Sequence, residues 1–310
     1  MTTIISMDGD HSTDEVIDWI HYFGADYKRI NIVKDIENEL FSFIKNNTEK
    51  PKTITSKGWI RKLGMFRSLS SYKNLLFDEQ FEMTNYLYSE LAVFKKLFQD
   101  EDIEWLCPPE SLRITKLDVL DAAIICGINI PETVVTNNKK TLVEIFKKYS
   151  GKIIVKSLTD SPVIVKEDNK FYPLTMRVNE ENLIDIPNIF FPSLIQQEIE
   201  KEYEIRSFYI NGKFYSSAIF SQADKQTAID FRNYNYKKPN RLVPYKLPLE
   251  IEIKLDKLCK TCDINTGSFD LIFSKTGEYY FLEINQSGQF GMVSKPCNYN
   301  LEKIIAKNII

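Results

Sequence analysis

A short hairpin near the C-terminal end constrains the interpretation of this sequence more than any other stretch. Residues 269–273 (Phe-Asp-Leu-Ile-Phe) and 279–284 (Tyr-Tyr-Phe-Leu-Glu-Ile) have the composition of β-strands, with a turn sequence between them. The side chains with oxygen ligands on this hairpin are Asp270, Glu283 and Asn285. Glu283 and Asn285 are two residues apart, so they face the same side of a strand. If Asp270 pairs near Glu283, all three side chains converge on one face.

Two carboxylates and one amide oxygen form a hard-oxygen site of the kind that Mg²⁺ prefers, especially when phosphate groups complete the octahedron. The competing interpretation is a solvated hairpin whose charges have no joint role. The hairpin alone does not decide between the two, so the decision depends on the remaining sequence.

The composition excludes several classes of function. The chain has 310 residues, enough for about two domains at ~150 residues each. Its net charge of −3 gives no general footprint for nucleic acid. No apolar run approaches ~18 residues, and the first residues lack the pattern of a signal peptide. Five cysteines, an odd number, favour a reducing setting, so we expect a cytoplasmic protein with no membrane and no nucleic-acid partner.

Histidine and cysteine offer few sites for zinc or for catalysis. Cys259 and Cys262 form one CxxC pair on an expected helix, but a zinc site needs two further ligands. The two histidines, His11 and His21, are far away in sequence, so core packing explains the cysteine pair better. The same scarcity disfavours Ser-His and Cys-His catalysis. Chemistry is therefore expected to depend on carboxylates, lysines, arginines and metal.

The first part of the chain has the pattern of a small open α/β domain. A strand–helix–strand unit is expected over residues 3–33. Further strands are expected at residues 41–44 and 53–60, and a long helix over residues 73–98. We place this first domain at residues 1–109.

The rest of the chain is expected to form two lobes. Residues 110–195 have the alternating helix and strand patterns of a small α+β lobe. Residues 196–310 begin with a polar linker and contain Asn211-Gly212, the strongest hairpin signal in the chain. Residues 224–244 are expected to be irregular, and they are rich in basic and aromatic side chains.

Five motifs follow one another in a set order between residues 116 and 285. They are Lys116 with the run Gly-Ile-Asn-Ile-Pro-Glu-Thr at 127–133, Ile-Ile-Val-Lys ending at Lys156, Gln-Gln-Glu at 196–198, Glu-Ile-Arg at 204–206, and the hairpin ligands. Two lysines would neutralise a triphosphate, a linker strand would offer backbone hydrogen bonds to adenine, and two carboxylates would hold Mg²⁺ against the phosphates. In this order and spacing the sequence resembles the ATP-grasp ligases.

The resemblance implies an α/β (α+β) chain with the ATP-grasp fold, in which an open α/β pre-ATP-grasp domain precedes two lobes that hold the nucleotide between them. Lys116 and Lys156 would contact the phosphates of ATP. Asp270, Glu283 and Asn285 would hold two Mg²⁺ ions. The other implied ATP-binding residues lie around the linker between the lobes: Gln196, Gln197, Glu198, Ile199 through its backbone, Lys201 and Glu204.

One segment departs from the ATP-grasp pattern. Many relatives have a glycine-rich loop over the phosphates after the second lysine, whereas residues 157–161 (Ser-Leu-Thr-Asp-Ser) contain no glycine. Hydroxyl groups and backbone amides would have to make those contacts instead.

A narrower resemblance covers essentially the whole chain. Residues 12–19, 28–31, 59–62, 230–232 and 283–290 are similar to the ATP-grasp enzymes that macrocyclise ribosomal peptides, the microviridin or graspetide group, and above all to the grasp-with-spasm peptide maturases. This implies that ATP activates an Asp or Glu side chain of a precursor peptide as an acyl phosphate. A Ser, Thr or Lys side chain would then attack and form an ω-ester or ω-amide macrocycle. A leader region would dock apart from an acidic, hydroxyl-rich core. The resemblance, and nothing else in the sequence, suggests a homodimer.

The same resemblance assigns residues to catalysis and to the substrate. Arg206 and Arg232 are the candidate catalytic residues, because guanidinium forks match carboxylate and acyl phosphate groups. Asp230, Arg232 and Ser287 are expected beside the peptide. The basic and aromatic segment 224–246 suits an acidic peptide core, although a single-stranded nucleic acid or a merely solvated loop would fit the same composition.

Two other functions remain open. One is an ATP-grasp amino-acid or glutamate ligase that acts on a protein or peptide terminus and shares all the nucleotide motifs. The other is a peptide-binding homologue that keeps the fold without catalysis. The intact set Asp270, Glu283 and Asn285 argues against the second, because a degenerate site usually loses ligands.

Overall fold

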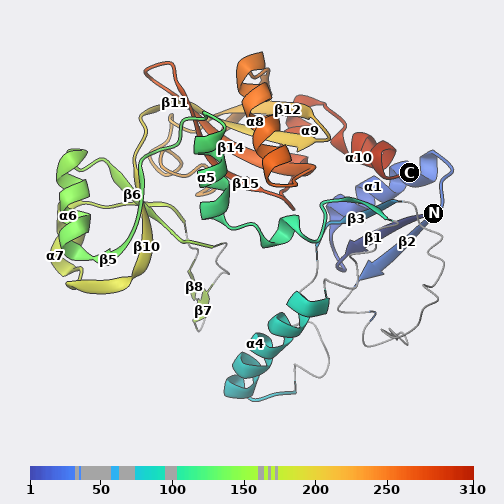
Figure 1. Ribbon diagram of the computed structural model, residues 1–310, viewed down its shortest axis with the longest axis horizontal. Coiled ribbons are helices and arrows are strands. Elements are labelled where there is room, and N and C mark those ends of the chain that lie inside the picture. Colours follow the sequence, from blue (N-terminus) through green and yellow to red (C-terminus); the bar gives the residue numbers. More distant parts are fainter. Residues whose placement is uncertain are drawn as a thin grey trace.

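The computed structural model of this protein describes residues 1–31, 35, 57–62, 74–94, 103–159, 164–166, 169–171 and 174–310. Within these residues the strands form four sheets, arranged as a small lobe and a larger body (Figure 1). The expected strand at residues 41–44 lies outside the described residues.

The N-terminal sheet is parallel, in the order β2-β1-β3-β4. Its elements are β1 (Thr2–Ser6), α1 (His11–Tyr22), β2 (Tyr27–Asn31), β3 (Lys57–Ile60) and β4 (Glu104–Leu106). Parallel pairing of β1 and β2 requires a crossover connection, and α1 provides it. The expected strand–helix–strand unit is therefore confirmed. The described part of the expected long helix is α4 (Phe77–Phe94), which extends away from the body in Figure 1.

The small lobe is an antiparallel sheet in the order β5-β10-β6-β9, covered by two helices. Its elements are β5 (Thr133–Asn138), α6 (Lys139–Lys148), β6 (Ile153–Lys156), β9 (Met176–Arg177), α7 (Glu180–Asp185) and β10 (Ile189–Gln197). A separate two-stranded antiparallel ribbon consists of β7 (Ile164–Lys166) and β8 (Asn169–Phe171). Ile153, Ile195 and Leu142 form the centre of the lobe's own small core.

The body contains a five-stranded antiparallel sheet in the order β13-β12-β11-β14-β15. Its elements are β11 (Lys201–Ile210), β12 (Lys213–Phe220), β13 (Arg241–Tyr245), α8 (Leu249–Thr261), β14 (Thr266–Ser274), β15 (Tyr279–Asn285), α9 (Gly291–Cys297) and α10 (Leu301–Ile309). Asn211 and Gly212 join β11 to β12 with φ angles of 44° and 83°, as a tight hairpin turn requires. The segment expected to be irregular ends in β13, so that expectation is wrong for its last residues.

Two shared cores join the parts of the body. Trp59 of the N-terminal sheet packs with Phe208 and Phe290, and α1 packs along α10. This places the two chain ends beside each other, as Figure 1 shows. The helix α5 (Lys116–Ile125) packs on β15 and α8, although it falls within the lobe expected at residues 110–195. Its burial is therefore with the body and not with the small lobe.

The cysteine pair lies in this body core. Cys259 is fully buried, and Cys262 is half-buried at the end of α8. Among the described residues, no group of three or more histidines, cysteines and carboxylates is placed to hold a metal ion. None of the described helices has both the length and the apolar character needed to cross a membrane.

Candidate active site

A cavity of about 420 Å³ lies between the small lobe and the body. Its wall on the lobe side includes Lys156 at the end of β6, and its wall on the body side includes Asp270 and Glu283 of the β14–β15 hairpin. The chain segment between the lobes, residues 197–201, closes one end. This size is in the range of natural small-molecule sites, ≈ 300–1,000 Å³.

The hairpin has the pairing that the sequence required. Asp270 lies directly opposite Glu283, and Ser268 lies opposite Asn285. The register shifts between Asp270 and Leu271, so the ladder is interrupted next to this carboxylate pair. Both carboxylates line the cavity, which confirms that the strand alternation turns them to one face.

Cations surround Glu283. The Nζ of Lys116, in the first turn of α5, is 3.0 Å from Oε2 of Glu283, and Nη1 of Arg232 is 3.9 Å from Oε1. Burial favours a neutral Glu283, but Lys116 and Lys156 outweigh it and lower the pKa of Glu283. Burial lowers the pKa of the Lys156 ammonium, and the negative charge of Glu283 only partly opposes this decrease.

A capping box explains where α5 begins and hence where Lys116 lies. Thr115 Oγ1 accepts the N–H of Asp118 at 3.2 Å, and the Asp118 carboxylate accepts the N–H of Thr115 at 2.8 Å. This reciprocal pair fixes the first helical turn, which carries Lys116 against the hairpin.

Asp270 has a different partner from Glu283. Nη1 of Arg206 on the neighbouring strand β11 donates to both carboxylate oxygens of Asp270, each at 2.6 Å. Both side chains are buried. Burial raises the pKa of Asp270, while Arg206 opposes the rise and nearby Glu283 adds to it. Arg206 lies behind Asp270 and is absent from the lining of the described cavities.

Asp230 and Arg232 form a second charged pair at the cavity wall. Nε and Nη2 of Arg232 donate to the two oxygens of Asp230 at 2.9 and 2.7 Å. The N–H of Thr175 in the small lobe also donates to Asp230. Burial would raise the pKa of Asp230, but these hydrogen bonds and the Arg232 charge hold it at about 2. The Arg232 side chain remains half exposed and faces the cavity.

Lys201 and Glu204 are buried together at the start of β11. Lys201 Nζ donates to Glu204 Oε1 at 2.5 Å and to the carbonyl of Ile229 at 3.0 Å. Ser221 also donates to Glu204, at 2.7 Å. Burial raises the pKa of Glu204, and the Lys201 charge opposes the rise. Both residues line the cavity near the linker.

The linker between the lobes presents backbone N–H groups at the end of the cavity, and the N–H of Ile199 is the one available to a ligand among the described residues. Gln197, Glu198 and Ile199 all line it, and Glu198 is held by an ion pair with Arg177. The N–H groups of Gln197 and Glu198 bond to other backbone carbonyls. The N–H of Ile199 has no hydrogen-bond partner within the described part of the chain. Gln196 points the other way, because its Nε2 donates to Thr133 Oγ1 at 2.9 Å and it does not line the cavity.

A second cavity, of about 240 Å³, lies on the other side of the Lys116–Glu283 pair. Asn285 and Thr159 also line it, whereas Lys156 and Asp270 do not. The expected metal ligands are thus divided between two cavities that share Glu283. Ser287 donates to Oδ1 of Asn285 at 3.4 Å but lines neither of the two.

Neither known protein families nor curated proteins match the sequence. Solved structures do match. The RiPP-associated ATP-grasp ligase of Chryseobacterium gregarium, solved with ADP and a leader and core peptide, superposes with a TM-score of 0.83 at 24% identity, over 99% of this chain and 94% of that chain. The macrocyclase MdnC of Microcystis aeruginosa MRC, bound with precursor peptide MdnA, gives a TM-score of 0.83 at 21% identity, over 100% and 99%.

The chain has the ATP-grasp fold. A RimK domain ATP-grasp protein from Sphaerobacter thermophilus DSM 20745 also matches, with a TM-score of 0.58 at 11% identity, over 100% of this chain and 99% of that chain. The mixed α/β fold expected from the sequence is therefore confirmed, and the main cavity lies between the two lobes of this ATP-grasp fold.

The oxygen donors of the β14–β15 hairpin fit Mg²⁺ chemically. Asp270 and Glu283 supply carboxylate oxygens to the main cavity, and Asn285 supplies an amide oxygen to the second cavity, which Glu283 also lines. Hard oxygen donors of this kind are what Mg²⁺ binds. A metal on Glu283 would have to share it with Lys116, and a metal on Asp270 would have to share it with Arg206.

One site-forming residue was not assigned from the sequence. Arg61 of the N-terminal domain donates to the carbonyl of Ser287 and, at 2.9 Å, to Oε1 of Gln289. It therefore holds the loop that follows Asn285. No local sequence pattern indicates this contact, because the partners are more than 220 residues apart.

Proposed function

We propose that this protein is an ATP-dependent ligase that matures a ribosomally made precursor peptide. ATP would activate Asp or Glu side chains of the peptide core as acyl phosphates, and Ser, Thr or Lys side chains would attack them to form ω-ester or ω-amide macrocycles. The observation that carries the proposal is the paired Asp270 and Glu283 in a cavity with Lys156 and Arg232. This cavity is set in a fold shared with ligases solved with peptides and nucleotide.

The nucleotide would lie in the main cavity, with adenine at the linker. Ile199 supports this, because it lines the cavity and its N–H has no hydrogen-bond partner among the described residues. Lys156 and Lys116 would neutralise the phosphates. Asp270, Glu283 and Asn285 would hold two Mg²⁺ ions, which neutralise the charge of the transferring phosphoryl group when bound. Lys116 lines the second cavity and pairs with Glu283, so it would contact the phosphates only if Mg²⁺ took its place on that carboxylate.

The reaction balances in two steps. A substrate carboxylate oxygen attacks the γ-phosphorus, and the bond from that phosphorus to the oxygen shared with the β-phosphate breaks. ADP is the leaving group, and the substrate carboxylate becomes an acyl phosphate. A hydroxyl or amine then attacks the acyl carbon, phosphate leaves, and phosphate takes the proton of the nucleophile. Arg232, half exposed at the cavity wall, is suited to orient the substrate carboxylate because its fork matches that group. Arg206 would act through Asp270, which it holds in place.

Two surface features are compatible with a peptide partner. The small lobe exposes the apolar side chains of Ile184, Ile189 and Phe191, which a leader segment would cover. All five cysteines are free, which supports our proposal of a cytoplasmic setting.

An amino-acid ligase of the ribosomal-protein-modifying type is the alternative enzyme. It would use the same nucleotide site, so the site alone does not separate the two. The fold similarity favours the peptide ligases, since their TM-score is 0.83, compared with 0.58 for the RimK domain protein.

The test is incubation of the protein with ATP, Mg²⁺ and a short Ser/Thr- and Asp/Glu-rich peptide encoded beside its gene, followed by mass spectrometry. Loss of one water mass for each link, together with ADP formation, is expected. Gain of an amino-acid mass would establish the alternative ligase. ADP formation that does not depend on any peptide or amino acid would contradict both.

A further inference from the structure

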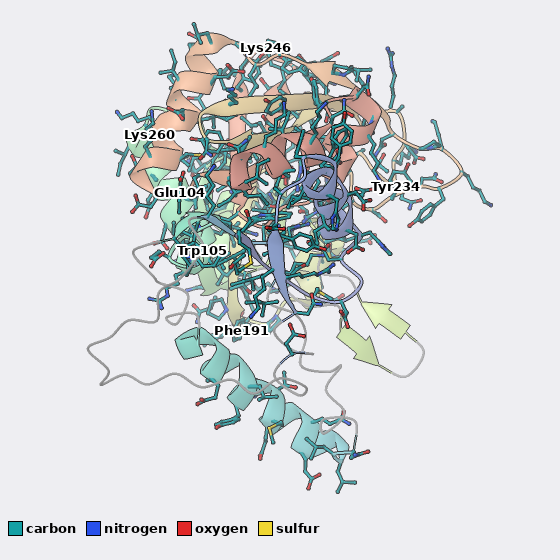
Figure 2. The ribbon with its side chains drawn as sticks, turned by 90° about the vertical axis from the view of Figure 1, so that its right-hand side faces the viewer. Glu104, Trp105, Phe191, Tyr234, Lys246 and Lys260 are labelled. Carbon is teal, nitrogen blue, oxygen red and sulfur yellow. The ribbon has the colours of Figure 1, made fainter. Side chains whose placement is uncertain are left out.

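An exposed pair of tyrosines marks the segment between β12 and β13, residues 221–240. The side chain of Tyr236 is 89% exposed and that of Tyr234 is 40% exposed, and their ring centroids are 5.1 Å apart. Figure 2 shows Tyr234 at the outer end of this segment, which projects from the body. Neighbouring aromatic side chains that are exposed to solvent in this way are typical of binding surfaces.

Hydrogen bonds within the segment hold it in shape. Asn235 Nδ2 donates to Asp224 at 2.6 Å, and Asn235 Oδ1 accepts the N–H of Lys237 at 3.0 Å. Gln226 donates to the carbonyl of Tyr234 at 3.2 Å. Lys238 Nζ donates to the carbonyl of Ala223 at 2.7 Å. The tyrosines are therefore presented by a cross-linked loop, which lowers the entropy cost of binding a partner.

The charge of the segment is positive towards solvent. Lys225 and Lys237 are exposed and form no ion pair within the described part of the chain. Arg241 lies over the ring of Phe220, 5.6 Å from its centroid, and also has no described acidic partner. The two acidic residues of the segment are already satisfied: Asp224 by Asn235, and Asp230 by Arg232. Positive charge is thus available for an acidic partner.

The same segment continues into the ATP-grasp cavity. Gln222, Ile229 and Arg232 line the cavity, while Tyr234 and Tyr236 lie a few residues further along on the outer surface. A peptide whose carboxylate reaches Arg232 would therefore have neighbouring residues close to the tyrosines. Successive residues of an extended peptide are at most ~3.6 Å apart, so a few residues span such a surface.

We propose that this outer surface, which we call the tyrosine platform (Tyr234, Tyr236, Lys225, Lys237, Lys238 and Arg241), binds the acidic stretch that flanks the reacting carboxylate of the peptide substrate. The inference rests on the proposed function. Tyr234 and Tyr236 supply rigid aromatic contact area, and the cations pair with peptide carboxylates. The platform would thus select acidic peptides before the chemical step.

The test is fluorescence anisotropy with labelled synthetic peptides of alternating Glu and Ser, with matching peptides of alternating Gln and Ser. Wild-type protein is compared with the Tyr234→Ser/Tyr236→Ser double variant and, separately, with Lys225→Glu/Lys237→Glu, whose side chains take no part in the hydrogen bonds that hold the loop. Tyr22→Ser is the matched control, because Tyr22 is 75% exposed on α1 in the N-terminal domain. Because these side chains are exposed, thermal melting should show the same fold for all proteins.

We expect the wild type to bind the Glu peptide and not the Gln peptide, and both platform variants to bind the Glu peptide at least about tenfold more weakly. Tyr22→Ser should bind as the wild type does. Equal affinity of all variants, or equal affinity for both peptides, would overturn the inference. Tighter binding of labelled oligothymidine than of the Glu peptide, lost in the same variants, would assign the platform to single-stranded nucleic acid and would also overturn it.

This measurement separates the platform from the proposed function. Binding of the Glu peptide is measured without ATP, so it does not depend on turnover. If platform variants lose binding while the wild type forms no linked peptide in the ligase test, the platform stands and the proposed function fails. If the wild type links its peptide and the platform variants show an unchanged KM, the platform inference fails alone.

Discussion

Glu283 is the residue on which the proposed chemistry depends most. Among the described residues it is the one carboxylate that lines both cavities, and Lys116, Lys156 and Arg232 all act on its charge. A glutamate in a partly buried site would otherwise tend towards the neutral form, which does not bind a metal ion. The surrounding cations keep Glu283 ionised, which is the form that the proposed role as a Mg²⁺ ligand requires.

Replacing Glu283 by glutamine should remove turnover without removing peptide binding. Gln is nearly the same size but provides no charge, so several kcal/mol of metal-assisted stabilisation is lost, roughly a hundredfold or more in rate. Peptide-dependent ADP release measures the rate, and anisotropy measures binding. Glu278→Gln, in the exposed turn of the same hairpin, is the control and should keep its rate. Equal rates in both variants would contradict the metal-binding role.

The lowered pKa of Lys156 predicts a pH effect. Burial lowers this pKa below the ordinary lysine value of about 10.4, and only the protonated amine attracts phosphate. As the pH rises through the lowered pKa, kcat/KM for ATP should fall, since that parameter reports the free enzyme. Arginine stays charged at every pH tested, so Lys156→Arg should lose this alkaline decline.

Rate measurements from pH 7 to pH 10 with varied ATP test this. Lys152→Arg is the control, because Lys152 also lines the cavity but its side chain is more than half exposed and pairs with Glu200. An alkaline decline that is identical in the wild type and in Lys156→Arg would show that another group titrates.

Side-chain direction was predictable from the sequence only where strand alternation was applied to a known pairing. Asp270 and Glu283 followed from the hairpin and were placed correctly opposite each other. Gln196 and Gln197 are neighbours on one strand, so only one of them faces the cavity, and it is Gln197. Arg206 donates to Asp270 from the neighbouring strand, and predicting this contact needs the register of β11 with β14, which the sequence pattern does not provide.

The loop of residues 286–290 is the element that connects the hairpin to the N-terminal domain. Arg61, which is 2% exposed, donates to Ser287 and Gln289, lies 3.6 Å from Asp10, and stacks over Phe290. The loop is packed tightly, because a Cβ on Gly288 would be 2.5 Å from the Cβ of Ser268. Since the loop follows Asn285 directly, its position sets that of the last metal-ligand candidate.

Arg61→Lys should therefore reduce turnover more than it reduces stability. Lysine keeps a positive charge near Asp10 but cannot donate to Ser287 and Gln289 in the same fork geometry. A shift of the loop should lower kcat by about tenfold or more, because small displacements of a site are costly in rate. Peptide-dependent ADP release and thermal melting are the measurements.

Lys57→Met provides the control for Arg61. Lys57 lies in the same stretch of chain and also bridges the N-terminal domain to the C-terminal end, through a hydrogen bond of 2.8 Å to the carbonyl of Ile310. The Lys57 contact does not involve the loop of residues 286–290, so turnover by Lys57→Met should stay at the wild-type level. A parallel loss of melting temperature and rate in both variants would mean that Arg61 is only structural.

Elements with strong local signals were predictable, and elements defined by long-range pairing were not. The strand–helix–strand start and the Asn211-Gly212 turn follow from sequence patterns, and both are confirmed. β13 was missed because its five residues contain Pro244 and pair only at the edge of the sheet, beside β12. α5 has the apolar residues of a packed helix, but nothing in their pattern indicates that they pack on the body and not on the small lobe.

At the scale of the whole molecule, the protein consists of one large body and one small lobe. The N-terminal sheet and the C-terminal sheet share buried residues through α1 and α10, and α5 joins the C-terminal core. The small lobe has its own core around Leu142 and Ile153, which is smaller than either core of the body among the described residues. The cavity lies where the two units meet.

This arrangement predicts that nucleotide binding stabilises the small lobe selectively. A lobe with a small core should open locally at a lower free energy than the body, so its amides should exchange hydrogen faster. A nucleotide that contacts Lys156 on β6 and the linker at residues 197–201 would couple the lobe to the body.

Hydrogen–deuterium exchange followed by mass spectrometry should therefore show slower exchange over residues 133–156 and 189–201 when ADP and Mg²⁺ are added, with little change in α8 and α10. Lys156→Ala should reduce this protection, while Lys246→Ala, remote on the body between β13 and α8, should keep it. Uniform protection of lobe and body, or protection that survives Lys156→Ala unchanged, would show that the nucleotide does not bridge the two units at this cavity.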